Sequence, residues 1–165
     1  MRFLIVALVF SSLLPMPLLA GEAPAAAAPT AAPSPAPGDV IPSFEAEAID
    51  GKTQKIDFPK GSKTVLLFFL SSCPVCHRMI PEWNRAYGER KGVNIYGIML
   101  DKEPPGFFLV TPIEFPVLRA PSRQFLDKIK VFRVPTTVRV GAGGTVEDAA
   151  QGQVDRMRVA QLFRP

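Results

Sequence analysis

The sequence is poor in the residues that make metal sites and disulfide scaffolds, with two cysteines and one histidine in 165 residues. Two cysteines form at most one disulfide, which excludes a scaffold of several bridges, and they cannot supply a four-cysteine zinc site. No internal repeat is present, which excludes a solenoid or a propeller. No run of lysine and arginine interleaves with aromatic residues, so the net charge of +4 indicates a mildly basic surface and no nucleic-acid partner.

The N-terminal residues have the pattern of an export signal. Arg2 precedes an unbroken apolar stretch over residues 3–10, and small residues follow at Ala20 and Gly21. This pattern predicts a signal peptide over residues 1–20, cleaved after Ala20 or Ala23, and a periplasmic or otherwise extracytoplasmic protein. An uncleaved membrane anchor is the alternative, because residues 3–20 lie at the short limit for spanning a bilayer.

The segment that follows is dominated by two residue types. Residues 21–38 contain eight alanines and five prolines. Such a segment has little apolar surface to bury, and proline interrupts helices, so we expect a disordered linker. Residues 39–165 remain, which is enough for one compact domain.

Within this domain, predicted strands and helices alternate. A tight turn at Asp50-Gly51 joins two strands into an N-terminal hairpin, and the apolar run over residues 64–70 is typical of a strand covered on both faces. Residues 101–114 are expected to form an irregular insertion or a short helix. The pattern predicts an α/β fold with a central mixed sheet flanked by helices. The expected strands cover residues 43–49, 52–58, 64–70, 93–100, 115–118, 136–140 and 145–149, and the expected helices cover residues 76–89 and 122–130 and a last helix capped by Asp155.

Both cysteines lie where the buried strand gives way to a helix, in the segment Cys73-Pro74-Val75-Cys76-His77. At this spacing two cysteines can close a small disulfide ring. The free N–H groups and the positive end of the helix dipole stabilise a thiolate at Cys73. We therefore predict that Cys73 is the nucleophile of a thiol–disulfide exchange and that Cys76 resolves the mixed disulfide.

Three other interpretations of this segment stay open. A static disulfide is one, although a bridge across so short a loop would stabilise the fold weakly. A metal site is another, although Cys73, Cys76 and His77 supply at most three ligands. The third is covalent attachment of a c-type haem, because Cys-x-x-Cys-His is also the pattern for that attachment, with His77 as the axial ligand.

Over residues 39–156 the sequence resembles the thioredoxin-fold, exported thiol-disulfide oxidoreductases of the TlpA/ResA type. The resemblance is carried by the two-cysteine segment after its apolar strand, by Pro81 five residues beyond Cys76, and by several short blocks. These blocks are Ile41-Pro42-Ser43-Phe44, Asp50-Gly51-Lys52, Phe115-Pro116-Val117-Leu118 and Val134-Pro135-Thr136-Thr137.

The resemblance implies a thioredoxin-like fold and a cis-proline loop in which Val134 and Pro135 present a backbone edge to the substrate chain. It implies exchange of electrons with cysteine-containing exported proteins, a membrane-bound electron donor or acceptor, and no bound cofactor or metal. Cytochrome c maturation, in which apocytochrome thiols are kept reduced, is the pathway that this resemblance favours.

The sequence departs from the family pattern at three positions. Leu67 stands where ordinary thioredoxin has a buried Asp, and Met79 stands where TlpA/ResA-type proteins often have Glu. Neither carboxylate is therefore present to take the proton of Cys76, which leaves water or His77 for that role. Ser72 replaces the Trp that commonly precedes the first cysteine.

Overall fold

The structure, a computed structural model, describes residues 34–165. The predicted signal peptide over residues 1–20 and residues 21–33 of the predicted linker lie outside the described residues. Between residues 34 and 165, no helix has both the length and the apolar character needed to cross a membrane.

The centre of the domain is a five-stranded sheet in the order β5-β4-β3-β6-β7. Strands β3 (Lys63–Phe69), β4 (Val93–Met99) and β5 (Val117–Arg119) run parallel to one another. Strands β6 (Thr136–Val140) and β7 (Val146–Gln151) complete the sheet by antiparallel pairing. The mixed sheet predicted from the sequence is confirmed.

The N-terminal hairpin is also present and forms a separate two-stranded sheet. Strand β1 (Phe44–Glu47) pairs antiparallel with β2 (Thr53–Ile56), with Phe44 opposite Ile56. Asp50 closes the turn by accepting a hydrogen bond from the Lys52 N–H at 3.1 Å. Each strand is only four residues long, and the hairpin buries its apolar side chains against the larger sheet.

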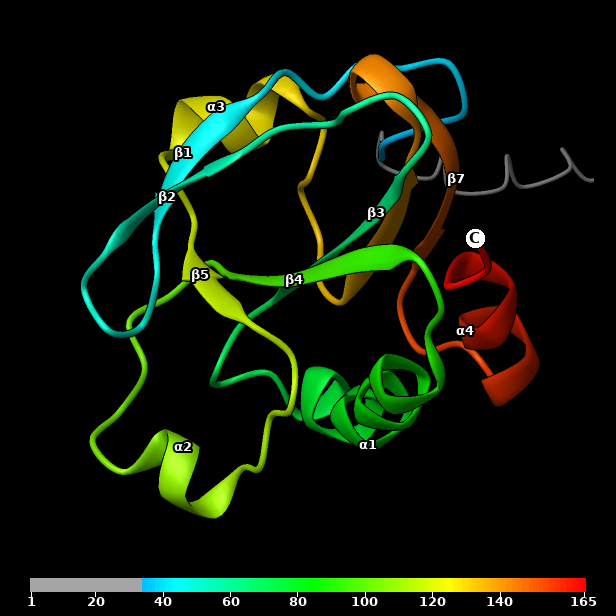
Figure 1. Ribbon diagram of the computed structural model, residues 1–165. Coiled ribbons are helices and arrows are strands. Elements are labelled where there is room, and N and C mark those ends of the chain that lie inside the picture. The colour runs from blue at the N-terminus through cyan, green and yellow to red at the C-terminus, as the bar shows by residue number, and fades with distance from the viewer. Residues whose placement is uncertain (1–33) are drawn as a thin grey trace, which may run out of the picture. The chain divides into compact units, whose positions relative to one another are not determined.

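Helices cover both faces of the central sheet (Figure 1). Helices α1 (Pro74–Glu89) and α4 (Arg156–Leu162) lie on one face, whereas α3 (Arg123–Lys128) and the β1–β2 hairpin lie on the other. The predicted caps are confirmed: Ser122 accepts a hydrogen bond from the Phe125 N–H at 3.1 Å, and Asp155 accepts one from the Arg158 N–H at 2.7 Å. The short helix α2 (Phe107–Val110) lies in the expected insertion.

Strand β3 separates two apolar cores because successive side chains of a strand point to opposite faces. Val65, Leu67 and Phe69 pack with α1 and α4, and all three are 0% exposed. Leu66 and Phe68, equally buried, pack with α3 and the hairpin. A continuous apolar run, rather than an alternating one, is what a strand covered on both faces requires.

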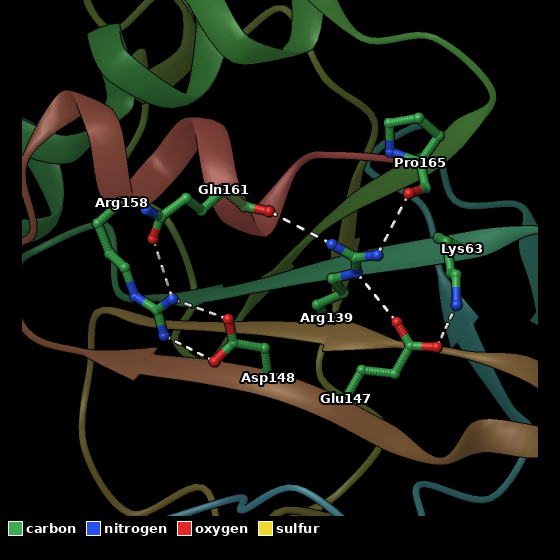
Figure 2. Close-up of polar contacts among 7 residues, drawn as sticks. All are labelled: Lys63, Arg139, Glu147, Asp148, Arg158, Gln161 and Pro165. Atoms are coloured by element: carbon green, nitrogen blue, oxygen red, sulfur yellow. Dashed lines mark hydrogen bonds and ion pairs between the residues drawn. The ribbon is translucent and has the colours of Figure 1, made fainter.

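Ion pairs fasten the C-terminal helix to the β6–β7 edge of the sheet (Figure 2). Arg158 of α4 donates two hydrogen bonds to Asp148 of β7, at 2.6 and 2.8 Å. Arg139 of β6 pairs with Glu147 at 3.0 Å and also donates to the carbonyl of Gln161, in α4, at 3.3 Å. These contacts orient α4 so that its apolar side chains reach the core shared with α1.

The start of the domain is held against the turn between β6 and β7, which contains the short helix η1 (Ala142–Gly144). Gly38, the last residue of the predicted linker, donates its N–H to the Val146 carbonyl at 2.9 Å, and Ile41 donates to the Gly144 carbonyl at 2.8 Å. Gly144 has φ +84°, and a Cβ there would lie 2.0 Å from the Ile41 carbonyl oxygen. The close approach of these two backbones therefore requires glycine.

Candidate functional site

The two cysteines lie at the carboxyl end of β3, in the centre of the sheet. Cys73 is the N-cap of α1, and its Sγ accepts a hydrogen bond from the Cys76 N–H at 3.2 Å. Pro74 occupies the start of the helix, where a missing N–H costs nothing. This cap makes α1 begin two residues earlier than predicted. Both cysteines are free thiols in this structure, with Cys73 half-buried and Cys76 fully buried.

The two thiols differ in burial, and burial determines the pKa of Cys76. Desolvation, followed by the hydrogen bond and the charge of Cys73, raises the pKa of Cys76 to about 12. Cys76 is therefore a neutral thiol around pH 7, whereas the half-buried Cys73 receives an N–H at the positive end of a 16-residue helix. The arrangement provides one sulfur that can attack and one that stays protonated until attack has occurred.

Asp101, two residues beyond the end of β4, holds the turn that precedes Cys73. Its carboxylate accepts hydrogen bonds from the Ser71 N–H at 2.7 Å and the Ser71 hydroxyl at 2.8 Å. The N–H and hydroxyl of Ser72 also donate to it, both at 3.3 Å. The carboxylate therefore satisfies four donors of two consecutive residues and ties the end of β3 to the end of β4.

His77 is attached to the same turn. Its Nε2 lies 2.6 Å from the carbonyl oxygen of Ser71, and because a carbonyl only accepts, Nε2 carries the hydrogen. The ring also packs on Phe107, with centroids 5.8 Å apart. Nε2 is thus engaged with the backbone, which opposes its use as a haem ligand and leaves Nδ1 as the only ring nitrogen for proton transfer.

The structure places apolar side chains at both positions where related proteins have a carboxylate. Leu67 is 0% exposed and Met79 is 1% exposed, and both pack in the core shared by α1 and α4. Neither position can accept the Cys76 proton. In the part of the chain that the structure describes, no group of three His, Cys, Asp or Glu side chains is arranged to hold a metal ion.

Val134 and Pro135 are joined by a cis peptide bond immediately before β6. Because Thr136 pairs with Phe68 across β3 and β6, the two residues lie beside the end of β3, where Cys73 follows. The Pro135 carbonyl accepts a hydrogen bond from the Gly152 N–H at 2.8 Å. The Val134 backbone forms no hydrogen bond with any residue from 34 to 165. Cys73 and Val134 are both partly buried and pack against the core shared by α1 and α4.

The insertion over residues 101–114 borders the site through Phe107, which is buried, whereas Leu109 and Val110 are 90% and 81% exposed. Glu103 anchors its base through Arg119 of β5, with N–O distances of 2.6 and 2.8 Å. Arg119 lowers the pKa of Glu103 to about 2.

Sequence reasoning missed Asp101. The signal for it is that a carboxylate directly follows the apolar run over residues 93–100. Adjacent parallel strands end at the same edge of a sheet, so a polar residue at the end of β4 lies near the turn after β3.

Comparisons with known proteins agree with this geometry. The sequence model described as the AhpC/TSA family matches residues 37–149. A thiol-disulfide oxidoreductase ResA of Oceanobacillus iheyensis is 27% identical over 124 residues, which cover 70% of this chain and 65% of that protein. The chain thus spans slightly less than two thirds of that relative. ResA of Halalkalibacterium halodurans is 21% identical over 131 residues, which cover 76% of this chain and 74% of that protein.

Solved structures show the same fold. A Chlorobium tepidum protein, whose structure carries the name thiol:disulfide interchange protein DsbE, superposes with a TM-score of 0.68 at 26% identity, covering 78% of this chain and 96% of that one. StoA of Bacillus subtilis superposes with a TM-score of 0.63 at 21% identity, covering 74% of this chain and 97% of that one. The thioredoxin-like fold and the resemblance to the TlpA/ResA type are confirmed.

Proposed function

The chain belongs to the AhpC/TSA family, and on that basis we propose that it is a thiol-disulfide oxidoreductase that works through Cys73 and Cys76. The observation that carries the proposal is the pairing of a half-buried thiol at a helix N-terminus with a fully buried thiol, linked by the 3.2 Å hydrogen bond from the Cys76 N–H to the Cys73 Sγ. The curated relatives bear the name of this activity, which supports the assignment.

The exchange proceeds in two displacements. The Cys73 thiolate attacks one sulfur of a partner disulfide, the partner S–S bond breaks, and the departing partner sulfur takes a proton. Cys76 then loses its proton and attacks Cys73, which releases the second partner thiol and leaves a Cys73–Cys76 disulfide. Two electrons pass from the protein to the partner. The reverse sequence oxidises a partner dithiol, and the potentials of the two couples set the direction.

The loop at Val134 and Pro135 is the proposed contact for the partner chain. The Val134 backbone has no hydrogen bond to any residue from 34 to 165, and it lies beside the strand end that leads to Cys73. An extended partner segment can pair with these backbone groups, which would hold its sulfur next to Cys73.

Export and the cellular partners belong to the same proposal. The N-terminal charge and apolar run support transfer across a membrane. A solved structural neighbour is an exposed lipoprotein thioredoxin of Streptococcus pneumoniae, at 21% identity. We propose that the partners are cysteine-containing exported proteins, among them apocytochromes c, and that a membrane-bound protein supplies or accepts the electrons.

Reduction of insulin by dithiothreitol tests the activity. The unmodified protein should accelerate the reaction and Cys73→Ser should abolish the acceleration. Incubated with insulin in the absence of dithiothreitol, Cys76→Ser should accumulate a mixed disulfide with insulin, detected as added mass. Equal rates for the unmodified protein and Cys73→Ser would show that the cysteine pair is not catalytic. Equilibration of the Cys73/Cys76 couple with glutathione buffers then gives its potential and hence its direction.

A further inference from the structure

A pocket of about 310 Å³ lies beside the cis-proline loop. Its walls come from the ends of β3, β4 and β5, from α3 and from the segment that leads to β6. The large apolar side chains in these walls are Leu70, Leu100, Leu126, Val131 and Val134. Such a lining offers a site for a bulky apolar side chain.

Two residues in the pocket wall connect the pocket to the proposed active site. Leu70 forms part of its wall and also accepts the hydrogen bond from the Cys73 N–H, at 3.3 Å. Val134, on another wall, carries the unpaired backbone groups of the cis-proline loop. A partner segment lying along Val134 with its cysteine at Cys73 therefore places a residue next to that cysteine over the pocket.

The rim of the pocket is aromatic and positively charged. Phe132 is 40% exposed. Arg133 is exposed and forms no ion pair with any residue from 34 to 165. Arg123, which also lines the pocket, pairs with Asp127 at 3.0 Å. None of the pocket's lining residues between 34 and 165 is acidic, so its charge complements an acidic ligand.

We propose that this pocket selects partner polypeptides in which the reactive cysteine is flanked by a bulky apolar residue and an acidic residue. The apolar side chain enters the pocket, and Arg133 pairs with the acidic one. The inference rests on the proposed oxidoreductase function, and it assigns a specificity to that site.

Peptide homodimers joined by one disulfide provide the test. Three peptides carry the central sequences Glu-Leu-Cys-Leu-Glu, Lys-Leu-Cys-Leu-Lys and Glu-Ala-Cys-Ala-Glu, whose symmetry makes the direction of binding irrelevant. The Cys76→Ser protein attacks each dimer through Cys73, forms a mixed disulfide with one peptide and releases the other as a thiol. Mass spectrometry of quenched samples gives the second-order rates.

The Glu-Leu peptide should react about fivefold faster than the Lys-Leu peptide, since an exposed charge contact contributes modestly and reversal adds repulsion. It should react about tenfold faster than the Glu-Ala peptide, because burial of a leucine side chain contributes more.

Adding Arg133→Glu to the Cys76→Ser protein should remove or invert the charge preference. Adding Ala120→Leu, which fills the pocket from its β5 side, should reduce the leucine preference to about twofold or less.

Matched controls come from α4, on the opposite face of the sheet (Figure 1). Arg156→Glu changes the charge equally, and Ala160→Leu adds the same side chain at an exposed position. Both should keep the preferences of the parent protein.

Equal rates for the three peptides, or a Glu preference that survives Arg133→Glu, would overturn the inference. Failure of the proposed function is a different result, since the protein would then react with none of the dimers and would not reduce insulin.

Discussion

The carboxylate of Asp101 accepts hydrogen bonds from both the N–H and the hydroxyl of Ser71, at 2.7 and 2.8 Å. Asp101 follows β4, and Ser71 lies two residues before Cys73 in the turn after β3. The cysteine that caps α1 therefore follows a turn that is fixed by a neighbouring strand. This contact makes Asp101 a positioning residue for Cys73, because it touches the turn and not the sulfur.

Asp101→Ala should loosen that turn. Four donors lose their acceptor, and the N–H of the buried Ser71 is the most costly to leave unpaired, so we expect a loss of about 1–3 kcal/mol in the free energy of unfolding. The rate of insulin reduction should fall about tenfold, because misplacement of a reacting group by a fraction of an ångström is costly. Denaturant unfolding and the insulin assay measure the two effects.

Asp57→Ala is the matched control for this variant, since Asp57 is exposed and forms its ion pair with the exposed Lys55, at 3.2 Å. It should change the free energy of unfolding by less than about 1 kcal/mol and leave the insulin rate unchanged. Asp101→Ala with the stability and the rate of the unmodified protein would contradict a positioning role.

His77→Phe separates the two contacts of His77. A phenyl ring keeps the packing on Phe107 but cannot donate to the Ser71 carbonyl. We expect a loss of about 0.5–1.5 kcal/mol in the free energy of unfolding, the range for one hydrogen bond. His77→Ala should lose more, because it also removes the ring, and urea unfolding of both variants measures the difference. Equal stability of His77→Phe and the unmodified protein would show that the 2.6 Å contact contributes nothing.

The elements of the fold could be predicted because each depends on a local pattern. The apolar run of β3, the turn at Asp50-Gly51 and the caps Ser122 and Asp155 are all visible in short stretches of sequence. The cysteine segment was visible for the same reason, since both sulfurs lie on one turn of one helix.

The features that could not be predicted depend on contacts between segments that are distant in the sequence. Ser71 and Asp101 are 30 residues apart, and nothing local to either one indicates the other. The contact of Gly38 with Val146 likewise depends on how residues 38–41, at the start of the domain, cross the β6–β7 turn. The composition of residues 21–38 therefore could not show where the linker meets the domain. The orientation of His77 toward a backbone carbonyl also follows from the turn that Asp101 holds, and not from the Cys-x-x-Cys-His pattern.

Glu103 should make stability depend on pH in the acid range. Its pKa is lowered to about 2 by the hydrogen bond and charge of Arg119. A lowered pKa in the folded state stabilises the fold above the unfolded pKa of 4.5, and this contribution disappears as the pH falls from 4.5 toward 2. Unfolding of the unmodified protein and of Glu103→Gln should thus differ at pH 6, and the difference should shrink toward pH 2. A difference that is constant over this range would contradict the ion pair.

The second displacement should depend strongly on pH. Burial raises the pKa of Cys76 to about 12, and neither Leu67 nor Met79 can take its proton. The thiolate fraction of Cys76 is therefore small at neutral pH and rises about tenfold with each pH unit well below the pKa. Burial, the largest cause of the shift, remains when Cys73 is bound in a mixed disulfide, so the pKa of Cys76 stays raised there, without the part that the charge of Cys73 contributes.

A mixed disulfide of Cys73 with 2-mercaptoethanol isolates this displacement. Its release, followed by stopped-flow mixing, should accelerate about tenfold per unit between pH 7 and pH 9 and show no plateau there. The corresponding adduct of Cys76→Ser should release nothing over the same range, which excludes hydrolysis of the adduct. A plateau near pH 8.5 would mean that Cys76 ionises like an exposed thiol. In that case the burial of Cys76 in the core shared by α1 and α4 does not control the second displacement, and another group takes the proton.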